Sequence, residues 1–184
     1  MKKVLRYLLM TVVTLCFSLP CFSGVEAAGV AIIPLINNVE GGDNLANQVF
    51  YKEAINTLKY QEGFFMVEND KLTVAIEAAM IGDDVPNKVT LAKIAKDSSV
   101  DIVFCMELDN LEYRNVKRVG ELVYKLDMEG EAVAYNALTG TFYKHKFSSD
   151  KEVDSALTAR GSLLYDEFGR QVRKELKKAL DLKK

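Results

Sequence analysis

The sequence predicts a single α/β domain of the three-layer type, with a mixed sheet and a long C-terminal helix. In the first half, short apolar runs alternate with segments of helical apolar spacing, as in strand–helix–strand units. Three strand-like segments and one long amphipathic segment follow, so the predicted order is β-α-β-α-α-β-β-β-α. The chain has 184 residues, 49% hydrophobic and 27% charged, which suffices for one substantial core and excludes a disordered or disulfide-dense protein.

The first 27 residues have the pattern of a secretory signal peptide. Basic residues precede the apolar run 8–19, which is too short to span a membrane. Small side chains near the end of the segment place the predicted cleavage between Ala27 and Ala28. We therefore expect an exported domain of residues 28–184, located in the periplasm or cell envelope or secreted.

An uncleaved anchor and a lipid-modified Cys21 are the alternatives to cleavage. The segment Ser18-Leu19-Pro20 before Cys21 departs from the lipidation motif, which favours cleavage. Cleavage would leave Cys105 as the last cysteine, so an internal disulfide is excluded. The apolar run 101–106 predicts a buried structural thiol there, with pairing between two chains as the alternative.

Short elements make up the first half of the predicted domain. The opening strand is apolar almost throughout, which is typical of a strand buried on both faces. The elements are a strand at 29–36, a loop at 37–44, a helix capped by Asp43 or Asn44 and ending near Gly63, a strand at 64–68, a helix capped by Asp70 and ending near Gly82, and a short helix capped by Thr90.

Longer elements make up the second half. Alternation of polar and apolar residues predicts three strands joined closely enough to form an antiparallel meander. They are a strand at 101–116, a strand at 121–134 with a bulge at Gly130, a turn at 138–140 and a strand at 142–147. The last helix, capped by Asp154 or Ser155, carries an apolar stripe of Leu157, Leu164, Phe168, Val172, Leu176 and Leu180.

Four stretches carry a resemblance to a known fold: 30–37, 63–72, 91–103 and 134–142. They resemble the N-terminal domain of the TolB translocation protein, the curli secretion lipoproteins and the outer-membrane lipoprotein activators of penicillin-binding proteins. The resemblance implies this fold and a non-enzymatic role in protein interaction. Ser98-Ser99-Val100 replaces the usual Gly-Ala of these proteins, and Asn136 replaces a common Asp. Charges at Lys125, Asp127 and Glu129 argue against the membrane-crossing strand pair of the pore-forming members.

Residues of enzymatic or metal-binding type are sparse. The single histidine, His145, lies in a strand between two lysines and is interpreted as a solvated side chain. One histidine and one cysteine are too few for a zinc site, and Asp83-Asp84 lacks calcium-loop spacing. Gly41-Gly42 lacks the phosphate-binding patterns. The sequence therefore predicts a protein that is not an enzyme and needs no metal or other cofactor.

Two surfaces are candidates for interaction. The first is the loop after the opening strand, together with the outer face of the sheet. The second is a basic helix face suited to anionic lipid or an acidic partner, although a solvated helix face is the alternative interpretation. The loop candidates are Asn37, Asn38, Glu40 and Asp43, and the helix candidates are Arg170, Arg173, Lys174, Lys177 and Lys178.

The preferred hypothesis is an exported adaptor or accessory domain that binds an envelope protein during secretion or envelope biogenesis. A homo-oligomer and peripheral membrane contact are compatible with it, whereas the net charge of −2 disfavours nucleic acid. The alternative is a periplasmic module for a small molecule or ion, bound by the loops after Ile36 and Glu68, where open α/β sheets hold ligands. A hydrolase is the weakest hypothesis because no nucleophile–base pair is visible.

Overall fold

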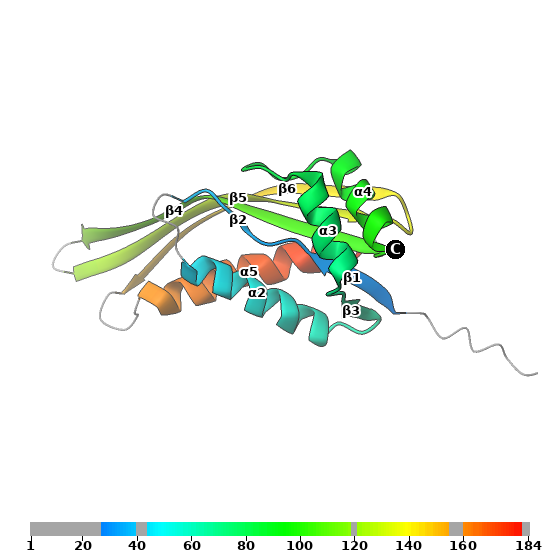
Figure 1. The fold of residues 1–184 in the computed structure, drawn as a ribbon. Coiled ribbons are helices and arrows are strands. Elements are labelled where there is room, and N and C mark those ends of the chain that lie inside the picture. The colour runs from blue at the N-terminus through cyan, green and yellow to red at the C-terminus, as the bar shows by residue number, and fades with distance from the viewer. Residues whose placement is uncertain (1–26, 40–43, 119–120, 155–159, 182–184) are drawn as a thin grey trace, which may run out of the picture.

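The computed structural model describes residues 27–39, 44–118, 121–154 and 160–181. Its centre is a six-stranded mixed sheet in the order β3-β1-β4-β5-β6, with β2 paired to β4 outside this path (Figure 1). The elements are β1 (Ala28–Ile32), β2 (Ile36–Asn37), α2 (Asn44–Lys59), β3 (Phe64–Met66), α3 (Asp70–Ala79), α4 (Lys88–Ser98), β4 (Ile102–Arg118), β5 (Glu121–Asn136), β6 (Thr141–Asp154) and α5 (Arg160–Asp181).

The predicted α/β class and element order are confirmed, with β2 as an addition. We expected one strand over 29–36, but Pro34 lies between β1 and β2 and cannot donate a ladder hydrogen bond. The short β2 instead pairs in parallel with β4 at Glu107 and Leu108. The predicted helix end near Gly63 is late, because α2 ends at Lys59.

The opening strand is the central parallel strand of the sheet. It pairs in parallel with β3 on one side and with β4 on the other. Its side chains alternate between two cores, and the predicted burial on both faces is confirmed. Val30 and Ile32 pack with α2 and α5, whereas Ala31 and Ile33 pack with α3 and α4. The sheet is thus the middle of three layers, with α2 and α5 on one face and α3 and α4 on the other (Figure 1).

The strands β4, β5 and β6 form the predicted antiparallel meander. They are longer than expected, and β4 and β5 extend past the helices at one end (Figure 1). The register shifts between Leu108 and Asn110, so Asp109 is the extra residue of a β-bulge. The bulge predicted at Gly130 is therefore in the facing strand, and Gly130 lies opposite Leu108. Because of the shift, Leu111 joins Leu108 in the same core.

Asparagine side chains cap two helices. Asn69 Oδ1 accepts a hydrogen bond from Leu72 N at 2.8 Å at the start of α3, and Asn87 Oδ1 accepts one from Thr90 N at 3.0 Å at the start of α4. The predicted caps Asp70 and Thr90 are wrong, since both lie within the first turn of their helix. The residue directly before each helix, Asn69 or Asn87, has the extended backbone that a cap requires.

The C-terminal helix α5 is described from Arg160 onward. Asp154 ends β6, so it does not cap the helix, while Ser155 and Leu157 lie outside the described residues. The rest of the predicted stripe is confirmed as core at Phe168, Val172, Leu176 and Leu180, whereas nothing is described of the Leu164 side chain. Among the helices of the described ranges, none combines the length and apolar character needed to span a bilayer.

Candidate functional site

A crevice opens at the carboxyl ends of β1 and β3. The chain leaves β1 toward α2 on one face of the sheet and leaves β3 toward α3 on the other, so the two connections diverge. Open α/β sheets bind ligands where connections diverge in this way. A cavity of about 670 Å³ lies there. The alternative hypothesis from the sequence placed a binding site after Ile36 and Glu68, and Glu68 does line this cavity.

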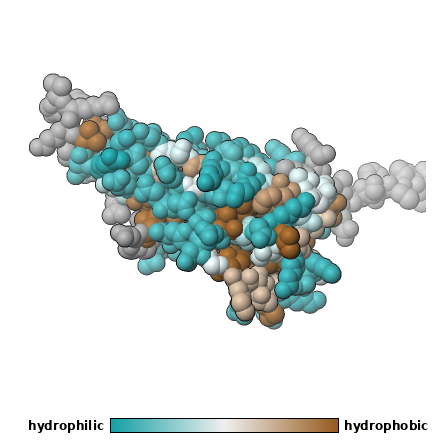
Figure 2. All heavy atoms as spheres, turned by 90° about the horizontal axis from the view of Figure 1, so that it is seen from above, coloured by the Kyte–Doolittle hydropathy of each residue, from teal (hydrophilic) through white to brown (hydrophobic). Residues whose placement is uncertain are grey.

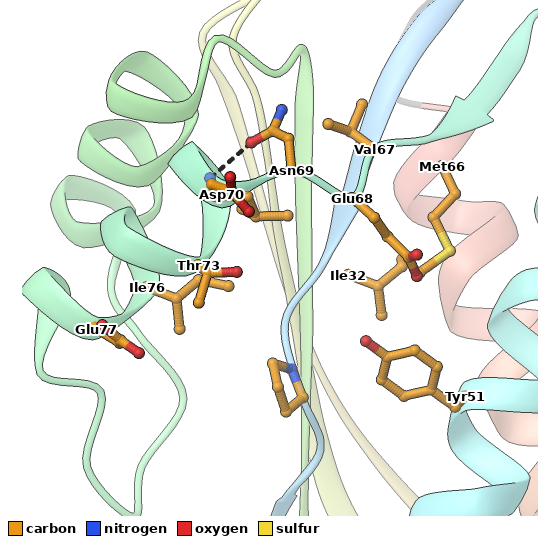
Figure 3. Close-up of a pocket in the computed structure, with 12 residues that line it drawn as sticks. Ile32, Tyr51, Met66, Val67, Glu68, Asn69, Asp70, Thr73, Ile76 and Glu77 are labelled. Atoms are coloured by element: carbon orange, nitrogen blue, oxygen red, sulfur yellow. Dashed lines mark hydrogen bonds between the residues drawn. The ribbon is translucent and has the colours of Figure 1, made fainter.

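Figure 3 shows how the crevice is built. Ile32 forms its floor between α3 on one side and Tyr51 of α2 on the other, and the Tyr51 hydroxyl is directed inward (Figure 3). Pro34 is also among the lining residues. Met66 and Glu68 extend from the end of β3 toward the same space. The full lining is Ile32, Pro34, Tyr51, Met66, Val67, Glu68, Asn69, Asp70, Leu72, Thr73, Ile76 and Glu77.

Backbone hydrogen bonds hold the walls of the crevice in place. Val67 N donates to Val30 O at 2.8 Å, which ties the segment after β3 to the central strand. Ile33 N donates to Phe104 O at 2.9 Å, which fixes the floor to β4. The Asn69 cap then sets the direction of α3 (Figure 3). The crevice is therefore preformed by strand pairing and capping rather than by a free loop.

The lining combines apolar and acidic side chains. Glu68, Asp70 and Glu77 contribute three carboxyl groups, and the lining contains no lysine, arginine or histidine. Tyr51 is 38% exposed although it is a large aromatic residue. Sequence reasoning missed these residues as a set, because they come from β1, α2, β3, α3 and the segments between them, and only the divergence of the connections brings them together. The rule that locates binding sites at strand ends was the one available signal.

The predicted interaction loop lies only in part within the described residues. Asn37 and Asn38 are described, whereas Glu40 and Asp43 are outside. Asn38 Nδ2 donates to Glu107 Oε1 and to Asp83 O, both at 2.7 Å. These bonds give Asn38 a structural role in holding the connection between α3 and α4 against the sheet.

Glu107 is the buried carboxyl group at this junction. It also accepts a hydrogen bond from Val85 N at 3.1 Å. Burial, and next a hydrogen bond with Asp109, raise the pKa of Glu107 to about 7. The junction therefore contains an acid that titrates near neutral pH.

The predicted basic helix face lies on α5, and much of its charge is paired. Arg170 Nη2 lies 2.5 Å from Glu167, Arg173 Nη1 lies 2.6 Å from Glu53 of α2, and Lys178 Nζ lies 3.1 Å from Glu175. Lys174 and Lys177 are exposed. Because three of the five cations face an acid, the surface is less positive than the sequence suggested, and its role stays a prediction.

Cys105 lies in the core, and His145 lies at its edge. Cys105 is fully buried, and burial, aided by Glu107, raises the pKa of its thiol, as suits a structural residue. His145 is less solvated than interpreted: its side chain is 40% exposed, but Nδ1 lies 3.0 Å from Oε2 of the buried Glu175 on α5. In the described ranges, no three His, Cys, Asp or Glu residues are grouped to hold a metal ion.

The outer face of the extended strands carries a ladder of ion pairs. Arg114 lies 2.5 Å from Asp127 and 3.4 Å from Glu112, and Lys125 lies 2.8 Å from Asp150 and 3.3 Å from Asp127. Seen from above, the half of the molecule formed by these strands is mostly hydrophilic, and hydrophobic residues gather nearer α3 and α4 (Figure 2). Such exposed pairs contribute little stability and keep this face solvated.

Comparison with known proteins finds the fold but no family. The sequence matches no known family and no curated protein. Among solved structures, the hypothetical protein CT253 from Chlamydia trachomatis is similar at 10% identity and a TM-score of 0.53, over 82% of this chain and 94% of that one. At this identity the likeness shows a shared fold alone.

Lipoproteins also occur among the similar structures. Lipoprotein GNA1162 from Neisseria meningitidis matches with a TM-score of 0.45 and 13% identity, over 84% of this chain and 99% of that one. The C-terminal domain of LpoB from Salmonella enterica matches with a TM-score of 0.41 and 13% identity, over 71% and 84%. Like CT253, these structures are similar to this chain in fold alone.

Proposed function

We propose that this chain is an exported accessory domain of the cell envelope that binds a protein partner through the crevice between α2, β3 and α3. The leader pattern of residues 1–27 supports export. The crevice supports binding, because it is open, preformed and lined by apolar side chains beside a few polar groups. This lining is the single observation on which the proposal depends.

An accessory role fits the chemistry of the described residues better than catalysis. The crevice lining contains neither histidine nor cysteine, and its hydroxyl groups belong to Tyr51 and Thr73. Cys105 is enclosed in the core, and His145 faces Glu175 on α5. Neither is among the residues that line the crevice, so the site offers no nucleophile paired with a histidine base.

A small-molecule module is the second candidate. The volume of about 670 Å³ falls within the range of known ligand pockets, which is what favours it. Thermal-shift measurements with nucleotides, sugars and divalent ions would separate the two. A small ligand that raises the melting temperature in proportion to its concentration would favour the module, and unchanged melting would favour the protein partner.

The direct test is site-specific photo-crosslinking in the native envelope. A photoreactive phenylalanine analogue replaces Tyr51 in the crevice or, as the matched control, Leu138 in the turn between β5 and β6. Leu138 is exposed and follows Asn136, which pairs with the first residue of β4, so it lies at the other end of the strands.

We expect one discrete envelope protein to be captured repeatedly from position 51 and not from position 138. Products that contain only this chain would indicate a homo-oligomer instead. Equal capture from both positions, or none from position 51, would contradict a binding role for the crevice.

A further inference from the structure

The charge of the crevice indicates what the partner presents to it. Resting on the proposed function, we infer that the partner inserts a lysine or arginine side chain flanked by an apolar residue. The first reason is charge complementarity: Glu68, Asp70 and Glu77 line the cavity, with no cationic side chain beside them in the lining. A cation enters such a site favourably, and an anion is repelled.

Among the described residues, no hydrogen bond or ion pair is found for the carboxyl groups of Glu68, Asp70 and Glu77. The ion pairs found in the described ranges use other acids, such as Glu53, Glu167 and Glu175. Acids in the first turn of a helix can stabilise it by facing its positive end, which accounts for Asp70. That effect fades within one turn, so it does not account for Glu77, seven positions further along α3.

Apolar groups beside the acids favour a side chain with a long hydrocarbon stem. Ile32, Pro34 and Met66 are apolar lining residues. Tyr51 adds an aromatic ring at the wall (Figure 3). Lysine and arginine bury their stems on apolar surface while the charged end meets an acid or an aromatic face. A neighbouring apolar side chain of the same segment would occupy the rest of the floor.

A peptide segment fits this lining better than a free polyamine. A polyamine carries charge along its whole length and gains little from contact with Ile32 and Pro34. A protein segment can place one cation at the acids and one apolar group on the floor. We therefore assign the crevice to a segment of a partner protein with adjacent basic and apolar residues.

The test is selection of random peptides on the purified chain 28–184, followed by affinity measurement. The selected peptides are labelled and titrated by fluorescence anisotropy with the wild type and with the triple variant Glu68→Gln, Asp70→Asn, Glu77→Gln. The control triple variant Glu62→Gln, Asp97→Asn, Asp166→Asn removes the same charge from exposed acids outside the lining. Thermal melting confirms that each variant is folded.

We expect selection to enrich lysine or arginine next to an apolar residue. Affinity should fall about tenfold or more in the crevice variant, and less than threefold in the control variant. Enrichment without basic residues, or equal losses in both variants, would overturn the inference. Spermidine that binds to the wild type with the same dependence on the three acids, while no peptide does, would also overturn it.

The outcomes distinguish this inference from the proposed function. Capture of a partner from position 51 without selection of basic peptides would leave the binding role intact and contradict the chemistry assigned here. Basic peptides that bind only when the three crevice acids are present, with no partner captured in the envelope, would support the inferred basic and apolar ligand. They would contradict the proposed role in the envelope.

Discussion

At the scale of single residues, Gly130 shows how closely the sheet is packed around the bulge. A Cβ atom at this position would lie 2.2 Å from the Glu107 carbonyl oxygen and 2.6 Å from Cζ of Phe147. Both distances are shorter than van der Waals contact, and the first is to a backbone atom, which cannot move without the rest of β4. Gly130 is therefore required by a close approach of β4 and not by a bulge of its own.

We expect Gly130→Ala to lower the free energy of unfolding by about 2–3 kcal/mol, because strands must separate to admit the methyl group. Gly82→Ala is the control, since a Cβ there would meet nothing within 4 Å. Urea denaturation of both variants measures the difference. Equal stability of the two variants would contradict the close approach.

Glu107 gives a prediction about pH. Its pKa is raised from an ordinary 4.5 to about 7, first by burial. Between these values the folded state holds a proton that the unfolded state has lost, so the contribution of this group is present below pH 4.5 and is lost as the pH rises through about 7.

We expect Glu107→Gln to flatten the decline in unfolding free energy between pH 5 and pH 8, because it removes the titrating group. Chemical denaturation at several pH values checks this, with Glu62→Gln as an exposed control. A decline as steep in Glu107→Gln as in the control would show that another group is responsible.

At the scale of elements, the periodicity of apolar residues predicts where the helices lie but not the residue at which each begins. Apolar spacing located every helix that was expected, because it reports which face is buried. It did not locate the first residue of α3, because Asn69 and Asp70 are both good capping residues and differ only in backbone conformation. Tertiary packing decides between them, and a single sequence does not contain that choice.

Asn69→Ala should therefore cost about 1 kcal/mol, because the amide of Leu72 loses the Asn69 Oδ1 acceptor at 2.8 Å and keeps only the longer bond to Asn69 O at 3.1 Å. Asp70→Ala should cost less, since it removes only a favourable charge at the helix end. Thermal or urea unfolding of the two single variants provides the comparison. A larger loss in Asp70→Ala would reverse the assignment of the cap.

At the scale of the whole molecule, the predicted cleavage point lies directly before the first residue of β1. Ala28 is the first residue of β1, and its amide donates to Gly63 O at 2.9 Å, while Ala27 is exposed. Cleavage between them would leave the central strand complete. Residues 1–26 lie outside the described ranges.

We expect the chain 28–184 to unfold cooperatively without the leader. A chain that begins at residue 34 should not fold, because it lacks the strand that joins β3 to β4. Circular dichroism and urea titration distinguish the two. Cooperative unfolding of the shorter chain would show that β1 is dispensable.

The fold could be predicted from the sequence to a larger extent than the site. Buried strands and amphipathic helices leave local patterns, and the order of elements follows from them. The crevice leaves no local pattern, since Pro34, Tyr51 and Glu77 become neighbours only through the topology of the sheet. The Asn38–Glu107 contact is likewise invisible locally, because 69 positions separate the two residues.

The bulge at Asp109 shifts the alternation of side chains between the two faces along the outer part of β4. Leu108 and Leu111 share one core only because one residue is skipped between them. Deletion of Asp109 would remove the extra residue, so that Asn110 follows Leu108 in an unbroken ladder and Leu111 and Tyr113 keep their places on the core face. We therefore expect that variant to stay monodisperse at the concentrations where the wild type does, as light scattering would show. The bulge therefore absorbs the one residue by which β4 exceeds strict alternation, and the apolar face of its outer part does not depend on that residue.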